Sequence, residues 1–295
     1  MNFKDLNLRE LDKDLTPAEL EEWNNIYASF RSGSLISGKV IGVDFHSFDV
    51  KSKKKDVPKK ELACLIAINY MVKIIIPEPE IWIEPMGATH VLRSMCGATI
   101  GYVITHIDRE NGFAIASRKT ALERLRFATR HKDMLGKTIK VDIISVGRNV
   151  CTAHFNGYDV LLRQKDISYN IIKDLRDEIH PGQIKYAVIK EWDTEKGIVN
   201  FSIKETTKHP FDGVDKRHPV GSTRMATIIN KYNGGVFCRL TDGVTDILCT
   251  YDAVAKDGDI HYDGDFLIGN TVEILIKKFN FDRKLVYGKI LRKLY

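Results

Sequence analysis

One internal repeat constrains the fold of this chain more than any other feature of its sequence. The segment from Gly97 to Lys119 aligns without a gap with the segment from Gly182 to Lys204, and eight of the 23 aligned positions are identical. The two segments are 85 residues apart, a period long enough for a whole structural unit. The fold is therefore expected to consist of similar units in tandem.

Each copy of the repeat has the pattern of a β-hairpin. An apolar-rich stretch leads into the sequence Asp-x-Glu-x-Gly, which starts at Asp108 in one copy and at Asp193 in the other, and a second stretch ends in Ser-x-Lys. The glycine can adopt the positive φ that a tight turn needs. A weaker third copy starts at Gly269, and Asp282 is expected to open its turn.

A second pair of strands is expected ahead of each hairpin. In the last copy, two stretches of alternating apolar residues flank Asp242-Gly243, a strong signal for a tight turn. Asn156-Gly157 has this position in the middle copy, and Asn69 has it in the first. A glycine-led strand precedes each pair, which gives about five strands per copy. Five short antiparallel strands suit a small closed barrel, because closure removes exposed edges.

Two other stretches have the pattern of helices. Thr16 is a good cap residue, Pro17 suits the first helical position and Glu19 the third, so a helix is expected to run to about Phe30. A second helix, beginning at Thr120, is expected to link the first two barrels.

The ordered set of motifs resembles the S1-type RNA-binding domain, a variety of the oligonucleotide-binding (OB) fold. Repeat three has the glycine-led first strand at Gly221 and the Gly-Gly-hydrophobic second strand from Gly234 to Phe237. Gly243 opens the third strand, although Asp246 stands where the family usually has a second glycine. Repeats one and two carry the family's last hairpin best, and the resemblance covers residues 34–295.

The resemblance implies a mainly β fold of three tandem five-stranded OB-type (S1-like) barrels, with an N-terminal helix and a linking helix. The expected parts are an acidic N-terminal helical arm (1–33), barrel one with a basic insertion (34–119), the linking helix (120–134), barrel two (135–205), a linker (206–219) and barrel three (220–295).

The third repeat offers the residue types that single strands need, which are cations for the phosphates and aromatic rings for the unpaired bases. The alternation in its second strand places Val236 and its alternate neighbours in the core, so Phe237 and Arg239 are expected to point outward. Lys231 and Tyr232 precede them on the adjoining strand. The family resemblance implies that an aromatic on this strand contacts RNA, whereas the structural alternative is that Phe237 covers the end of the barrel or the inter-domain contact.

The other two repeats depart from this pattern, because Cys151 and Cys64 stand near the place of Phe237. Candidate nucleic-acid contacts in repeat two are Arg148, His154, Phe155 and Arg163. Repeat one instead has a lysine-rich insertion, which is either a phosphate-binding loop or simply a solvated one. Its candidate contacts are Lys53, Lys54 and Lys55.

Composition excludes several classes of function. No apolar run approaches the roughly 20 residues of a bilayer helix, and no export signal opens the sequence, so a cytoplasmic protein is expected. The five cysteines contain no CxxC pair, and the acidic stretch from Asp257 to Asp265 lacks the spacing of a calcium loop. No common catalytic motif is present. Neither an enzymatic activity nor a metal or other cofactor is expected.

The net charge of +6 is unevenly distributed, since residues 1–33 carry four basic and seven acidic side chains. The basic remainder suggests a polyanionic partner. The sequence therefore predicts a binder of single-stranded RNA in translation or RNA metabolism, with the ribosome or another large complex as a further partner. Two alternatives remain, namely a single-stranded DNA binder in replication or transcription and a protein–protein adaptor that docks on a larger machine.

Overall fold

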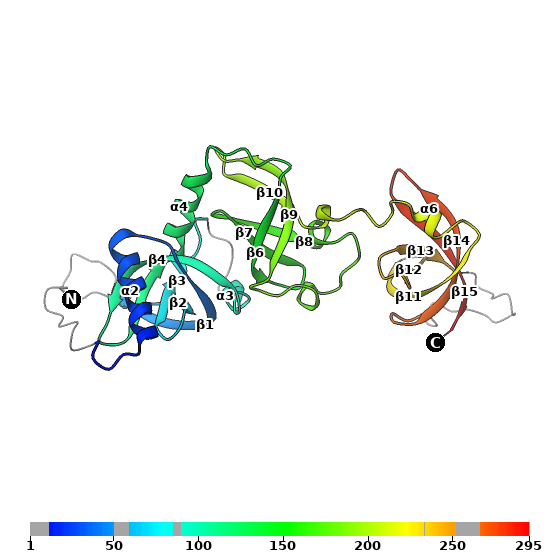
Figure 1. Cartoon of the computed structure of the whole chain (residues 1–295). Helices are drawn as coiled ribbons and strands as arrows, with labels where there is room; N and C mark the ends of the chain where they lie inside the picture. Colours follow the sequence, from blue (N-terminus) through cyan, green and yellow to red (C-terminus); the bar gives the residue numbers. More distant parts are fainter. Residues whose placement is uncertain (1–11, 50–58, 85–89, 233, 252–265, 295) are drawn as a thin grey trace. The chain divides into compact units, whose positions relative to one another are not determined.

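The computed structural model describes residues 12–49, 59–84, 90–232, 234–251 and 266–294, and its strands form three five-stranded sheets (Figure 1). The chain divides into two compact units. The first comprises residues 1–163 and 173–203, and the second comprises residues 164–172 and 204–295. No helix among the described residues is long and apolar enough to cross a membrane.

The first sheet is a closed barrel with the strand order β1-β2-β3-β5-β4. Its strands are β1 (Ile36–Asp49), β2 (Lys59–Ile68), β3 (Lys73–Pro77), β4 (Thr99–Asp108) and β5 (Phe113–Ser117). The parallel pairing of β3 with β5 closes the barrel, and all its other strand pairs are antiparallel. Two short helices, η1 (Glu78–Glu80) and α3 (His90–Arg93), lie between β3 and β4 in the chain.

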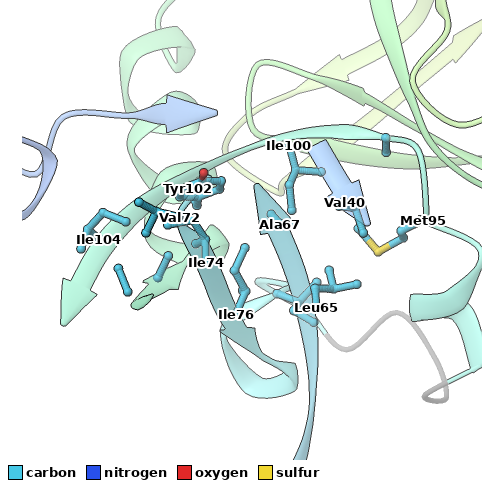
Figure 2. Close-up of a cluster of buried hydrophobic side chains, with 14 of the residues drawn as sticks. Val40, Leu65, Ala67, Val72, Ile74, Ile76, Met95, Ile100, Tyr102 and Ile104 are labelled. Atoms are coloured by element: carbon cyan, nitrogen blue, oxygen red, sulfur yellow. The ribbon is translucent and has the colours of Figure 1, made fainter. Parts of the chain in front are cut away.

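The core of the first barrel follows the alternation of its strands. Figure 2 shows Leu65 and Ala67 of β2 beside Ile74 and Ile76 of β3, and all four are at most 1% exposed. Tyr102 of β4 is completely buried in the same cluster. Burial of these apolar surfaces is the main force that holds the barrel together.

Helix α2 (Pro17–Ser32) packs on the first barrel through Trp23, Ile26 and Tyr27. The predicted capping box is confirmed, because Thr16 and Glu19 each bond the other's backbone amide.

The buried carboxylate of Glu22 ties α2 to the turn between β2 and β3. It accepts hydrogen bonds from the backbone amides of Tyr70, Met71 and Val72 at 2.8 to 3.1 Å. These bonds satisfy the amides of a turn that has no glycine.

The second sheet has the order β10-β9-β6-β7-β8. Its strands are β6 (Thr138–Val146), β7 (Val150–Phe155), β8 (Tyr158–Arg163), β9 (Ile184–Asp193) and β10 (Ile198–Ser202). The order matches the first barrel, but among residues 138–202, all of which are described, the closing pair of β8 with β10 is not formed. Between β8 and β9 the chain forms α5 (Gln164–Ile167) and η2 (Leu175–Asp177).

The third sheet is again a closed barrel, with the order β11-β12-β13-β15-β14. Its strands are β11 (Thr223–Tyr232), β12 (Gly235–Leu240), β13 (Asp246–Thr250), β14 (Thr271–Asn280) and β15 (Leu285–Lys293). The mainly β fold of tandem five-stranded OB-type barrels with an N-terminal helix is thus confirmed.

The stretch predicted as a linker, 206–219, is packed rather than free. It contains the short helix α6 (Val214–Arg217) and follows η3 (Lys204–Thr206). Phe211 and Val214 belong to the same buried cluster as the core of the third barrel. The domain boundaries expected from the sequence remain a prediction.

The repeated hairpin turns are built as the sequence predicts in two copies and differently in the third. Gly112 and Gly197 both have φ of 70°, and the aspartates that open their turns accept backbone hydrogen bonds three residues on. In the third copy Asn280 accepts the equivalent bond from Arg283, so Asn280, not Asp282, opens the turn. The expectation for Asp282 was wrong because the amide side chain of Asn280 can perform the same role.

Helix α4 (Arg118–Thr129), the predicted linking helix, follows β5 in the chain (Figure 1). A buried ion pair at its first residue joins it to the second sheet. The Arg118 guanidinium makes two hydrogen bonds of 2.7 Å to the Asp159 carboxylate on β8 and lies 5.0 Å from the Trp82 ring centroid. Burial would raise the pKa of Asp159, but Arg118 and His154 overcome this effect and hold it well below its ordinary value.

Candidate nucleic-acid interface

The second strand of the third barrel has the orientation that its alternation predicts. Val236, Cys238 and Leu240 are at most 2% exposed and line the core. Phe237 and Arg239 are half-buried on the outer face. The parity argument for these two residues is confirmed, whereas their role in binding stays a prediction.

Strand pairing places Phe237 in a row of outward residues that crosses four strands. Phe237 is opposite Leu248 on β13, Leu248 is opposite Tyr287 on β15, and Tyr287 is opposite Lys278 on β14. The Lys278 ammonium lies 5.1 Å from the Tyr287 ring centroid. We call these four residues the aromatic row. Directly opposed side chains on one face of a sheet are close enough to act as a single surface.

Tyr232 extends the aromatic row at the end of β11. Its ring centroid lies 5.2 Å from that of Phe237, with an interplanar angle of 56°. The Tyr232 hydroxyl lies directly over Gly235, where an added Cβ would come within 2.4 Å of it. The second glycine of the Gly-Gly pair is therefore required for close approach of the tyrosine.

The predicted cations beside the aromatic row have different surroundings. Arg239 donates to both carboxylate oxygens of Asp246, at 2.8 and 3.2 Å. It also donates to the carbonyl of Ile171 in the same compact unit. Lys231 is half-buried opposite Val236. Arg239 thus has a structural partner in Asp246, the residue that replaces the usual second glycine of the motif.

The second sheet has no aromatic residue in the equivalent row. Strands β6 and β11 have a bulge at the same place, and the pair that follows it is Ser145 with Thr152 in one sheet and Asn230 with Phe237 in the other, so Thr152 matches Phe237. Thr152 is buried and its hydroxyl accepts a hydrogen bond of 2.8 Å from Ser145. Cys151 is a core residue at the position of Val236. Cys151 therefore lies one residue from the position of Phe237, near the place that the sequence indicated.

The first barrel is also without aromatic residues in this row. Ile66, not Cys64, matches Phe237, and it pairs with Ile75, which pairs in turn with Ile115. Ile66 and Ile75 are 6% and 3% exposed and form a buried cluster with Cys64. Among the described residues, only the third barrel therefore presents aromatic rings at these positions.

The four predicted contacts of repeat two do not form one site. His154 lies 2.9 Å from Asp159 in the Arg118 network, and the Phe155 ring packs edge-on against Trp192 at 6.3 Å. Arg148 and Arg163 are both exposed, at the opposite end of the β7–β8 pair from His154 and Phe155.

The predicted lysines of repeat one lie outside the described residues. Strand β1 is described to Asp49 and β2 from Lys59, so Lys53, Lys54 and Lys55 stay a prediction. The acidic stretch from Asp257 to Asp265 also lies outside the described residues.

Leu248, Tyr287 and Lys278 were not predicted from the sequence. The alternation of β13 and β15 could have identified Leu248 and Tyr287 as outward residues. Their alignment with Phe237 depends on the parallel pairing of β13 with β15, and the position of Lys278 depends on a bulge in β14. Neither pairing nor bulge can be read from the local sequence.

Two closed five-stranded barrels and a third sheet of the same strand order define a tandem-barrel protein of the OB class. No protein-family model matches the chain. Sequence comparison finds similarity to small ribosomal subunit protein bS1 of Coxiella burnetii (19% identity) and of Neisseria meningitidis (21% identity). Each match covers 90% of this chain and 45% or 44% of the relative. The chain is thus similar to bS1 in sequence and spans about half the length of these curated relatives.

Other similar proteins match over a smaller share of this chain or with a lower identity. The 4-hydroxy-3-methylbut-2-enyl diphosphate reductase of Clostridium tetani is 22% identical over 73% of this chain and 34% of its own length. A solved multidomain protein with nucleic acid binding domains from Streptococcus pneumoniae aligns over 89% of this chain and 74% of its own, with 7% identity and a TM-score of 0.20. An a/eIF2alpha-aDim2p-rRNA complex from Pyrococcus horikoshii aligns over 29% of this chain and 57% of its own, with 14% identity and a TM-score of 0.24. Neither score is high enough to add to the fold assignment.

Proposed function

We propose that this chain binds single-stranded RNA, without catalysing a reaction, through the outer face of its third barrel. The observation that carries the proposal is the aromatic row, in which Phe237, Tyr287 and Lys278 lie on one face with Tyr232 at its edge. Exposed rings stack on unpaired bases of any sequence, and each stack contributes about 1 to 3 kcal/mol. Lysine beside them neutralises the phosphates.

RNA is chosen over DNA because the chain is similar to bS1, a protein of the small ribosomal subunit. The same similarity supports a translational setting, with the ribosome as the larger partner, in the cytoplasm. The first two sheets then act mainly as a scaffold, since their equivalent rows begin with Ile66, Ile75 and Ile115 in the first and with Thr152 and Leu161 in the second.

The proposal is tested by comparing fluorescent RNA and DNA oligomers of equal sequence over a salt series. We expect tighter RNA binding and a logarithmic salt slope of about −0.7 per phosphate contacted. The variant Phe237→Ala should bind RNA about 5- to 150-fold more weakly, which corresponds to one lost stack. Leu161→Ala is the matched control, because Leu161 pairs with Thr152 as Leu248 pairs with Phe237.

Each alternative predicts a different result. Equal affinity for RNA and DNA would show that the protein binds single-stranded nucleic acid in general, with no preference for RNA. Absence of any salt-dependent binding would contradict the proposal and favour a protein-binding adaptor. Unchanged affinity in a folded Phe237→Ala variant would remove the aromatic row as the site.

A further inference from the structure

The second compact unit contains a cavity of about 530 Å³ beside the third barrel, which we call the linker pocket. It is lined by residues 167–170, by side chains between Lys204 and Arg217, and by Val244. Its volume lies in the range of roughly 300 to 1,000 Å³ that is usual for ligand sites. Lys204 is the lysine that closes the repeated Ser-x-Lys motif, and the aromatic row gives it no role.

The walls of the linker pocket are held in place by contacts that a ligand would not have to form. Phe211 and Val214 are anchored in the core of the barrel. Arg217 donates to the backbone carbonyls of Asp212 and Pro210. Next to the lining residue Asn170, the Ile171 amide donates to the Asp246 carboxylate and the Ile171 carbonyl accepts from the Arg239 guanidinium. A pre-formed site of this kind loses little conformational entropy on binding.

The charge in the linker pocket favours an anion. Lys204, Lys208 and Arg217 line it, and Asp212 is its only lining acid among the described residues. Burial lowers the pKa of His209, and the positive charges of Lys284 and Lys204 lower it further, against the opposing effect of Asp212. The lysines around His209 therefore add to the effect of burial, and the three lining cations outnumber the one lining acid.

The same pocket offers aromatic surface. The rings of Tyr169 and His209 have centroids 4.2 Å apart, and the Lys204 ammonium lies 5.0 Å from the Tyr169 centroid. The Nδ1 atom of His209 accepts a hydrogen bond of 3.0 Å from the Phe211 amide, which fixes the orientation of the ring. Aromatic rings beside lysines are the combination that nucleotides require.

The linker pocket is continuous with the face that carries the aromatic row. A smaller cavity of about 100 Å³ shares Tyr169, His209 and Val244 with it and extends to Asp246 and Lys284. Asp246 pairs with Arg239, which follows Phe237 by two positions on the same face of β12. Two strand residues span about 7 Å, so a strand bound along β12 would reach this cavity within a few nucleotides.

We propose that the linker pocket binds a nucleotide, with its phosphate beside Lys204 and Lys208 and its base against the Tyr169–His209 pair. The inference rests on the proposed function, since the nucleotide is taken to belong to the strand that lies on the aromatic row. A free mononucleotide has the same chemistry, and the experiment distinguishes the two sources.

The first measurement uses the full chain and oligouridylates of about 4 and about 12 nucleotides, which bracket the site size of a single OB fold. The longer oligomer should bind more tightly, and the double variant Lys204→Gln/Lys208→Gln should remove this gain while leaving the shorter oligomer unaffected. Its salt slope for the longer oligomer should decrease in magnitude by about 1.4, which corresponds to two phosphate contacts.

The matched control is Lys165→Gln/Lys216→Gln, which removes two exposed lysines of the same unit that do not line the pocket. It should keep both the gain with length and the slope. Equal slopes in the two double variants would overturn the linker pocket while leaving the aromatic row intact.

The second measurement follows the His209 ring by nuclear magnetic resonance, with the signal assigned by His209→Gln. A phosphate bound beside Lys204 and Lys208 should raise the pKa of His209, because its negative charge offsets the charges of Lys284 and Lys204, which lower that pKa. A shift with the 12-nucleotide RNA alone supports the strand, and a shift with uridine monophosphate supports a free nucleotide. If RNA fails to bind, the proposed function fails and the mononucleotide titration still decides the pocket. No shift with either ligand overturns the inference.

Discussion

Tyr287 is the residue that turns Phe237 from an isolated ring into part of a continuous surface. It lies across Leu248 from Phe237, and Lys278 packs over its ring. Its outward orientation follows from its buried neighbours on β15, Val286 and Gly288. A base stacked on Phe237 would therefore have a second ring within reach of the next base.

We expect Tyr287→Ala to weaken RNA binding about 5- to 150-fold, because one stack of about 1 to 3 kcal/mol is lost. Tyr287→Phe should bind as the native chain does, since the ring remains. The measurement is fluorescence anisotropy at fixed salt. A Tyr287→Ala variant that is folded and binds normally would show that the strand does not cross β15.

Asp242 is expected to make the third barrel sensitive to acid. Burial would raise its pKa, but hydrogen bonds from the Thr245 hydroxyl and amide, from His218 and from the Val244 amide lower the pKa to about 2. The stabilisation is present above the unfolded pKa of 3.8 and is lost as the pH falls from there towards 2.

Hydrogen exchange of the β12 and β13 amides should therefore show a decrease in opening free energy between pH 4 and pH 2, a window set by the unfolded and folded pKa values of about 3.8 and 2. Asp242→Asn should flatten this decrease. Tryptophan fluorescence would not report it, because Trp23, Trp82 and Trp192 all lie in the first compact unit. An unchanged pH profile in the variant would assign the acid sensitivity to other carboxylates.

At the scale of elements, the Gly-Gly pair at the start of β12 has two separate requirements. Gly234 has φ of 97°, a region that favours glycine, whereas an added Cβ at Gly235 would clash with the Cys249 carbonyl and the Tyr232 hydroxyl. Gly234 therefore provides the positive φ of the turn, and Gly235 leaves the space that Tyr232 occupies at the edge of the aromatic row.

Gly235→Ala should displace Tyr232 and weaken RNA binding by about the value of one stack, roughly 1 to 3 kcal/mol, with some loss of stability. Gly112→Ala is a control for stability alone. The positive φ at this position would strain an alanine, but an added Cβ would meet no neighbouring atom. Binding and thermal unfolding measured together separate the two effects. Normal affinity in Gly235→Ala would mean that Tyr232 takes no part.

The elements were predictable from the sequence to the extent that local signals define them. The turn glycines, the capping box of α2 and the alternation of β12 are all local, and each was confirmed. The bulges in β6 and β14 and the parallel pairing that aligns Tyr287 with Phe237 arise from barrel closure. Packing of Phe211 and Val214 in the core of the third barrel is likewise a tertiary effect, and the prolines and glycine that indicate an inter-domain linker do not predict it.

At the scale of the whole molecule, the Arg118–Asp159 pair makes the first two sheets one compact unit. Both side chains are at most 5% exposed, and they join the start of α4 to β8. Removing one partner leaves the other buried without compensation, which is more damaging than removing both.

We expect Asp159→Leu to destabilise the first unit by about 3 to 5 kcal/mol, and the double variant Arg118→Met/Asp159→Leu to be more stable than the two single effects imply. Denaturant unfolding followed by tryptophan fluorescence is suitable, because Trp82 lies beside Arg118. Additive effects in the double variant would show that the two side chains do not depend on each other.

The carboxylate of Glu22 restricts which side of helix α2 a larger complex could bind. That side chain accepts hydrogen bonds from three amides of the β2–β3 turn, and Trp23 and Ile26 are buried against the barrel. The apolar side of α2 is therefore already packed. A partner that bound the apolar side would first have to detach the helix from the barrel, and the three amides would lose their hydrogen bonds to Glu22. Attachment through the exposed side of the helix, which includes Leu20, Glu21 and Asn24, would leave these contacts in place.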